Sequence, residues 1–144
     1  MADVTVTADQ VGLVDPIKAY VKSYKCGEAI TKGAIVAMNT DGTLMIADST
    51  DGAVDYKFEQ VQGVALQAGA AGAYIDVCQD GDVYGFTVSG LNAGALLWLS
   101  ETAGKLATTD VGATTYVGRI TSLPTPTPTL AVRIQIIFAE AKAA

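Results

Sequence analysis

The chain has 144 residues, with 15 acidic and 9 basic side chains, a net charge of −6 and no histidine. This length fits one domain, or two small lobes that share a core, and a chain of this size needs neither a metal nor a disulfide in order to fold. The acidic balance argues against a nucleic-acid partner, and the lack of histidine excludes mechanisms in which histidine activates a serine or a cysteine.

Residues 1–26 are expected to form an N-terminal arm together with the first strands. Residues 3–7, "DVTVT", alternate polar residues with valine, which is typical of a strand. Residues 17–25, "IKAYVKSYK", also favour a strand because Tyr and Val have high strand propensity, whereas a helix would bring Tyr20 next to Tyr24. No signal peptide is expected, and no apolar run approaches the roughly 20 residues that a membrane helix needs.

A β-hairpin is predicted to follow this segment. Two apolar runs, residues 34–39 and 43–48, flank Thr40-Asp41-Gly42, and Asp-Gly tolerates the positive φ of a tight turn. Residues 124–129 alternate Pro with Thr, which predicts a stiff exposed loop, and residues 139–144 are expected to form a flexible tail. Further strands are predicted at residues 61–68, 73–81, 83–90, 95–100, 105–110, 115–123 and 129–138.

One phrase occurs twice. Residues 33–48, "GAIVAMNTDGTLMIAD", and residues 94–110, "GALLWLSETAGKLATTD", both open with Gly-Ala, continue with an apolar run, and close with a Gly-containing turn, a Leu and an Asp. We therefore predict an all-β fold of two similar repeats, residues 27–90 and 91–138, which cover each other's apolar faces in one compact sandwich-like or barrel-like unit. The register equates Gly33 with Gly94, Gly42 with Gly104, Gly63 with Gly118, and "AYIDVCQ" with "LAVRIQI".

Acidic clusters are the first candidates for a chemical site. The aspartates of "IDVCQDGD" offer the carboxylates that Ca²⁺ prefers, but they lack the full calcium-loop spacing, and a polar turn between strands is the simpler interpretation. A second acidic stretch is interpreted as a solvated loop, with a metal loop as the alternative. The residues are Asp76, Asp80 and Asp82 in the first cluster and Asp48, Asp51, Asp55 and Glu59 in the second.

Other reactive or aromatic residues also have a structural interpretation. Cys26 and Cys78 are interpreted as small buried side chains, and a bridge between them stays open. Trp98 alternates with leucines in a predicted strand, which indicates core packing, with a ligand platform as the alternative. The sequence therefore predicts no catalytic residue, no metal site and no cofactor.

The order of these phrases resembles a known family. Residues 83–109, "VYGFTVSGLNAGALLWLSETAGKLATT", are similar to a phrase of tailed-bacteriophage head decoration proteins, which are also called capsid cement proteins. Residues 27–48, "GEAITKGAIVAMNTDGTLMIAD", and residues 61–83, "VQGVALQAGAAGAYIDVCQDGDV", are similar to two earlier phrases of that family. The resemblance spans residues 27 to about 137, and residues 1–30 and the Pro-Thr loop have no counterpart.

This resemblance implies a structural virion protein without catalysis. Such a protein is made in the host cytoplasm, binds the major capsid protein on the outer surface of the expanded shell, often as a homotrimer, and stabilises that shell. Nucleic acid and membrane are not expected partners. The N-terminal segment is a hypothetical source of capsid or subunit contacts, because an extended arm can add a strand to a neighbouring sheet. Its candidate contact residues are Val4, Val6, Ile17, Tyr20 and Tyr24.

Two other functions stay open. The chain would be a glycan-binding or adhesion module if Trp98, Tyr84 and Tyr116 shared an exposed face. It would be a metal-dependent hydrolase if the aspartate clusters held a metal ion.

Overall fold

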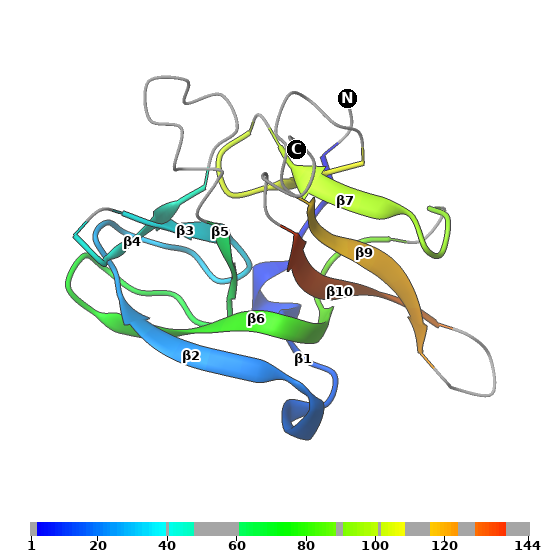
Figure 1. Ribbon diagram of the computed structural model, residues 1–144, viewed down its shortest axis with the longest axis horizontal. Helices are drawn as coiled ribbons and strands as arrows, with labels where there is room; N and C mark the ends of the chain where they lie inside the picture. Colours follow the sequence, from blue (N-terminus) through cyan, green and yellow to red (C-terminus); the bar gives the residue numbers. More distant parts are fainter. Residues whose placement is uncertain are drawn as a thin grey trace.

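The computed structural model describes residues 3–39, 41–47, 61–88, 91–100, 102–108, 116–123 and 129–137. Within these residues the chain is all-β, as predicted, and its strands form one antiparallel sheet that curls into a half-barrel (Figure 1). The strands are β1 (Gly12–Leu13), β2 (Tyr20–Lys25), β3 (Ile35–Met38), β4 (Leu44–Ile46), β5 (Val61–Ala65), β6 (Tyr74–Tyr84), β7 (Leu96–Leu99), β8 (Leu106–Ala107), β9 (Tyr116–Leu123) and β10 (Thr129–Ile137). Two 3-10 turns, η1 (Ala8–Gln10) and η2 (Pro16–Lys18), precede β2.

The long strand β6 lies in the middle of the sheet. The main path runs β4-β3-β5-β6-β10-β9-β7-β8, and β1 and β2 pair with β6 off this path. The predicted break of β6 into residues 73–81 and 83–90 is wrong, because the strand continues through Gly81. This glycine has a φ of 140°, and a Cβ atom there would lie 2.8 Å from the Cβ of Ala19. Gly81 therefore permits a close approach and does not make a turn.

The hairpin of β3 and β4 is confirmed. Val36 pairs with Ile46 and Met38 pairs with Leu44. At the turn Gly42 has a φ of 86°, and the Asp41 carboxylate accepts a hydrogen bond from the Thr43 N–H at 3.0 Å. The Asp-Gly signal identified this turn, in which Gly42 adopts the positive φ, whereas Asp41 does not and accepts the Thr43 N–H with its side chain.

The pairings of β3, β4 and β5 correspond to those of β7, β8 and β9. Val36 pairs with Gly63 next to a register shift, and Leu97 pairs with Gly118 next to the same kind of shift. The hydrogen bonds that flank these pairs also correspond: Gly33 N–H to Ala65 O and Ala65 N–H to Ala34 O in the first set, and Gly94 N–H to Ile120 O and Ile120 N–H to Ala95 O in the second.

The last strands follow a register that differs from the predicted one. Ala65 pairs with Val77, and its counterpart Ile120 pairs with Val132. The structure thus equates Val77 with Val132, whereas matching "AYIDVCQ" with "LAVRIQI" equates Val77 with Ile134. The predicted match is shifted by two residues, which keeps every side chain on the same face of the strand and so preserves the apolar pattern.

The N-terminal residues pack on the domain's own strands. Residues 3–7 do not form the predicted strand but make isolated bridges, Asp3 with Ala107 and Val6 with Phe86. The predicted strand at residues 17–25 begins only at Tyr20, because the Asp15 carboxylate accepts the Ile17 N–H at 3.1 Å and starts the turn η2. Pro16 also favours such a turn.

Two clusters of buried side chains make up the core. The larger one contains side chains from strands towards both ends of the path. Among these side chains are Ile35, Val64, Leu97, Ile120 and Val132. The smaller one lies under β3, β4 and β6. Both cysteines are buried with free thiols, Cys78 in the larger cluster and Cys26 in the smaller. Burial raises the pKa of the Cys78 thiol to about 11, so both behave as small apolar residues, as interpreted.

We predict that Gly63→Ala destabilises the protein by about 3 kcal/mol. Gly63 has a φ of 147°, and an added Cβ would lie 2.0 Å from the carbonyl oxygen of Cys78 in β6. Gly12→Ala is the matched control, because no atom lies within 4 Å of its Cβ position and its φ is not positive. Urea unfolding of both variants measures the difference, and equal losses would contradict the structure.

We also predict that Ser100→Ala raises the pKa of Asp3. The hydroxyl of the fully buried Ser100 donates a hydrogen bond to the Asp3 carboxylate. This bond, with a second from Thr102, holds the pKa of Asp3 below its usual 3.8. A carboxyl with a lowered folded pKa stabilises the fold above pH 3.8, and this contribution is lost as the pH falls through the folded value. Because Asp3 is exposed, solvent screens this contribution and keeps it small.

Carbon-13 NMR titration of the Asp3 carboxyl measures this shift. The midpoint should lie below 3.8 in the wild type and move up towards 3.8 in Ser100→Ala. Ser122→Ala, an exposed serine on β9, should leave it unchanged. An unchanged midpoint in Ser100→Ala would show that the bond does not form.

Candidate interaction surface

Two borders of the sheet are covered by the chain itself. At β4, the Gly27 N–H donates to the Leu44 carbonyl at 2.8 Å, and the Glu28 carboxylate accepts the Ile46 N–H at 2.8 Å. At β8, the Val4 N–H donates to the Leu106 carbonyl at 2.8 Å. These contacts use backbone groups that an edge strand would otherwise expose.

The outer edge of β2 is different. β2 pairs with β6 along one edge over its whole length, and it forms a border of the described sheet in Figure 1. The Cys26 N–H donates to the Ala73 carbonyl. Because alternate residues of an antiparallel strand face the same neighbour, Tyr24 and Lys22 also face β6, and the backbone groups of Ser23 and Lys25 face outwards. No hydrogen bond to this outer edge occurs among the residues that the structure describes.

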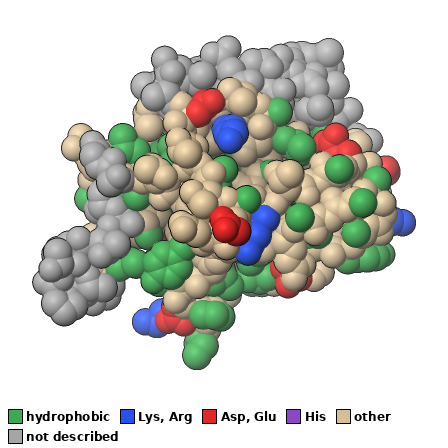
Figure 2. Space-filling model, turned by 180° about the vertical axis from the view of Figure 1, so that it is seen from behind, with side chains coloured by type: hydrophobic (Ala, Val, Ile, Leu, Met, Phe, Trp, Pro, Cys, Tyr) green, Lys and Arg blue, Asp and Glu red, His purple; other side chains and the backbone are tan. Residues whose placement is uncertain are grey.

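Basic and apolar side chains accompany this edge. Lys18, Lys22 and Lys25 are exposed, and so are Ile17, at 93%, and Tyr20, at 58%. We call these five residues together with the outer backbone edge of β2 the β2 border. Seen from behind, the molecule shows basic side chains next to acidic ones (Figure 2). With Lys18, Lys22 and Lys25, the β2 border holds three of the chain's 9 basic residues.

The five predicted contact residues fall into two groups. Val4 is buried at 3% exposure, and Val6 is partly buried against the same core cluster. Tyr24 is half-buried, and its hydroxyl accepts a hydrogen bond from the Gln79 amide at 2.9 Å. Ile17 and Tyr20 alone of the five are largely exposed, so in this structure they are the two that a partner can reach.

Lys22 and Lys25 were not among the predicted contacts. Their signal in the sequence was the concentration of lysine in residues 18–25 of an otherwise acidic chain. The Lys22 Nζ lies 5.3 Å from the centroid of the Tyr24 ring, a cation–π distance that places its ammonium over the aromatic face.

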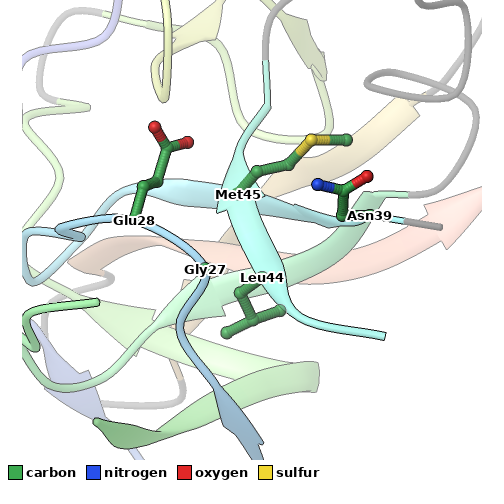
Figure 3. Close-up of a pocket in the computed structure, with 5 residues that line it drawn as sticks. All are labelled: Gly27, Glu28, Asn39, Leu44 and Met45. Atoms are coloured by element: carbon green, nitrogen blue, oxygen red, sulfur yellow. The ribbon is translucent and has the colours of Figure 1, made fainter. Parts of the chain in front are cut away.

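A shallow hollow of about 200 Å³ lies beside β4. Its lining residues are Gly27, Glu28, Asn39, Leu44 and Met45, and Figure 3 shows that Leu44 points away from the side to which Glu28 and Met45 project. Glu28 is the one titratable residue of the five, and its carboxylate already accepts the Ile46 N–H. The hollow therefore does not bring together two groups that could exchange a proton.

The aspartates of "IDVCQDGD" lie in β6, so the predicted polar turn is wrong. Asp76 accepts a hydrogen bond from the Ser23 hydroxyl. Within the described ranges no group of three His, Cys, Asp or Glu residues is placed to hold a metal ion. The second acidic stretch, Asp48, Asp51, Asp55 and Glu59, lies outside the described residues, as do residues 124–128 and 139–144.

The aromatic residues of the adhesion hypothesis lie on different strands. Trp98 in β7 is half-buried and pairs with Ala107 and Tyr116. Tyr84 at the end of β6 is 46% exposed and pairs with Gly12 of β1. The Tyr116 side chain lies outside what the structure describes.

No helix among the described residues has the length and apolar character needed to cross a membrane. Compared with protein-family models, with curated proteins and with solved structures, the chain has no significant match to any of them.

We predict that Ile17→Ser combined with Tyr20→Ser leaves the free energy of unfolding within about 0.5 kcal/mol of the wild type. Both side chains are exposed and bury little apolar surface. By contrast, Val4→Ala removes buried methyl groups and should cost about 2 kcal/mol. Urea unfolding compares the variants. A large loss in the double variant would place Ile17 and Tyr20 in the core and would remove them from the β2 border.

Proposed function

We propose that the chain is a structural protein of a tailed-phage particle that binds the outer surface of the expanded capsid and stabilises it. The sequence phrases that resemble head decoration proteins support this, because they contain the strands from β3 to β8. Gly33 and Gly94 both have positive φ, at 89° and 86°, and both open the corresponding hydrogen-bonded pairs of β3 with β5 and β7 with β9.

The corresponding pairings further support a duplicated unit within this protein. Each set consists of a hairpin followed by two strands, and β6 and β10 pair with each other where the sets meet. One set alone would leave its apolar face in water, and the two sets share the larger core. We therefore propose that the chain consists of two copies of one β unit, and that the N-terminal segment packs along both copies.

The β2 border is the observation that carries a binding role. It combines an open backbone edge with exposed Ile17 and Tyr20, and aromatic residues are enriched in protein interfaces. On a capsid lattice many such contacts act together, so a weak individual contact gives firm attachment through high effective concentration. A homotrimer would multiply the contacts again. The proposed partner is the major capsid protein, and the protein lies on the outer surface of the particle.

Co-sedimentation with decoration-free shells of the phage tests this function. Purified protein is mixed with unexpanded and with expanded shells, and bound protein is measured against added protein. We expect saturable binding to expanded shells only, together with a higher melting temperature of those shells. Binding to neither form would contradict the proposal and would direct attention to a glycan screen of the adhesion hypothesis.

A further inference from the structure

We propose that the β2 border accepts an extended acidic segment of a partner protein as an additional strand of the sheet. The outward backbone groups of Ser23 and Lys25 offer the donors and acceptors that a new strand needs. The borders at β4 and β8 are already covered by Gly27, Glu28 and Val4. The inference deepens the proposed function, and it rests on that function where the segment belongs to a capsid protein.

The positive charge of the lysines in the β2 border favours an added strand that carries negative charge. Lys22 and Lys25 occupy positions of opposite parity in β2, so one lysine lies on each face of the sheet. An added strand would lie about 4.8 Å from β2, and the backbone of β6 lies one strand further away, at about 10 Å, although the Asp76 carboxylate reaches β2 at the Ser23 hydroxyl. Lys22 and Lys25 are the charged side chains of β2 itself, the strand that an added strand would contact directly.

A second copy of the chain fits this border less well. Pairing β2 with β2 of another copy would bring Lys18, Lys22 and Lys25 from each molecule into one interface, where like charges repel. The same three lysines attract glutamate or aspartate on an added strand. Exposed Tyr20 begins β2, and exposed Ile17 lies in the preceding turn η2, so both provide apolar contact at that end of the added strand.

Peptides of defined charge test the inference on the full chain. The probes are ten-residue peptides that alternate Thr with Glu, Thr with Gln, or Thr with Lys, added to nitrogen-15-labelled protein. The Thr-Glu peptide should shift the amide signals of β2 and slow hydrogen exchange at Ser23 and Lys25, while Lys22 and Tyr24, which already face β6, change little. Equal effects of the Thr-Glu and Thr-Lys peptides, no effect of the Thr-Glu peptide, or shifts confined to another strand would overturn it.

Charge reversal provides the matched variants. Lys22→Glu combined with Lys25→Glu should weaken Thr-Glu binding about tenfold, and Lys22→Gln combined with Lys25→Gln should weaken it less. Lys32→Glu changes the charge equally but lies outside the border, and it should bind as the wild type does. Unchanged binding in the reversed variant would overturn the inference. The Gln variant is the control for a folding defect, because it removes both positive charges without adding negative ones.

The same variants separate this inference from the proposed function. If wild type and reversed variant bind expanded shells equally, the acidic-strand inference fails and the capsid role stands. If the wild type binds no shells but still binds the Thr-Glu peptide at β2, the capsid role fails and the acidic-strand inference stands.

Discussion

The pairing of β6 along both of its edges is the interaction on which the rest of the structure depends. Val77 and Cys78 pair with β5 on one side and with β2 on the other, and the following residues pair with β10 and β1. On the main path, β6 and β10 are the strands where the two sets of corresponding strands meet. The chain must therefore come very close to β6 from several directions. Gly63 and Gly81 make this possible, because a side chain at either position would overlap a neighbouring residue.

These close approaches also explain which parts of the fold the sequence could predict. The hairpin of β3 and β4 follows from local turn chemistry at Asp41 and Gly42, so its prediction was correct. Gly81 lies between two aspartates and resembles a turn locally, yet its glycine is needed because Ala19, more than sixty residues earlier, packs against it. No local pattern contains that contact. The two-residue shift between the last strands has a similar origin, since a shift of two preserves the alternation of apolar residues and only strand pairing distinguishes the registers.

The candidate surface was predictable to a similar degree. The sequence placed Ile17, Tyr20 and the lysines in one alternating segment, but it could not say which side chains the domain would bury. Val4 and Val6 have the same alternating pattern as an exposed arm. In the structure Val4 is buried, and its N–H donates to the Leu106 carbonyl at the outer edge of β8. The exposure of a side chain in this segment depends on which borders of the sheet the chain covers with its own residues. Only the completed topology shows which borders are covered.

The β2 border differs from the covered borders at β4 and β8, and this difference indicates a binding role. Lysines along an edge strand discourage pairing between identical copies, and many proteins protect an edge in this way. Protection alone requires no apolar surface, yet Ile17 is almost fully exposed and Tyr20 is more than half exposed beside the lysines. Large apolar side chains next to an unprotected edge would promote aggregation, whereas next to three positive charges they favour a partner of opposite charge. A border that repels its own copies and retains apolar anchors is suited to a specific acidic strand.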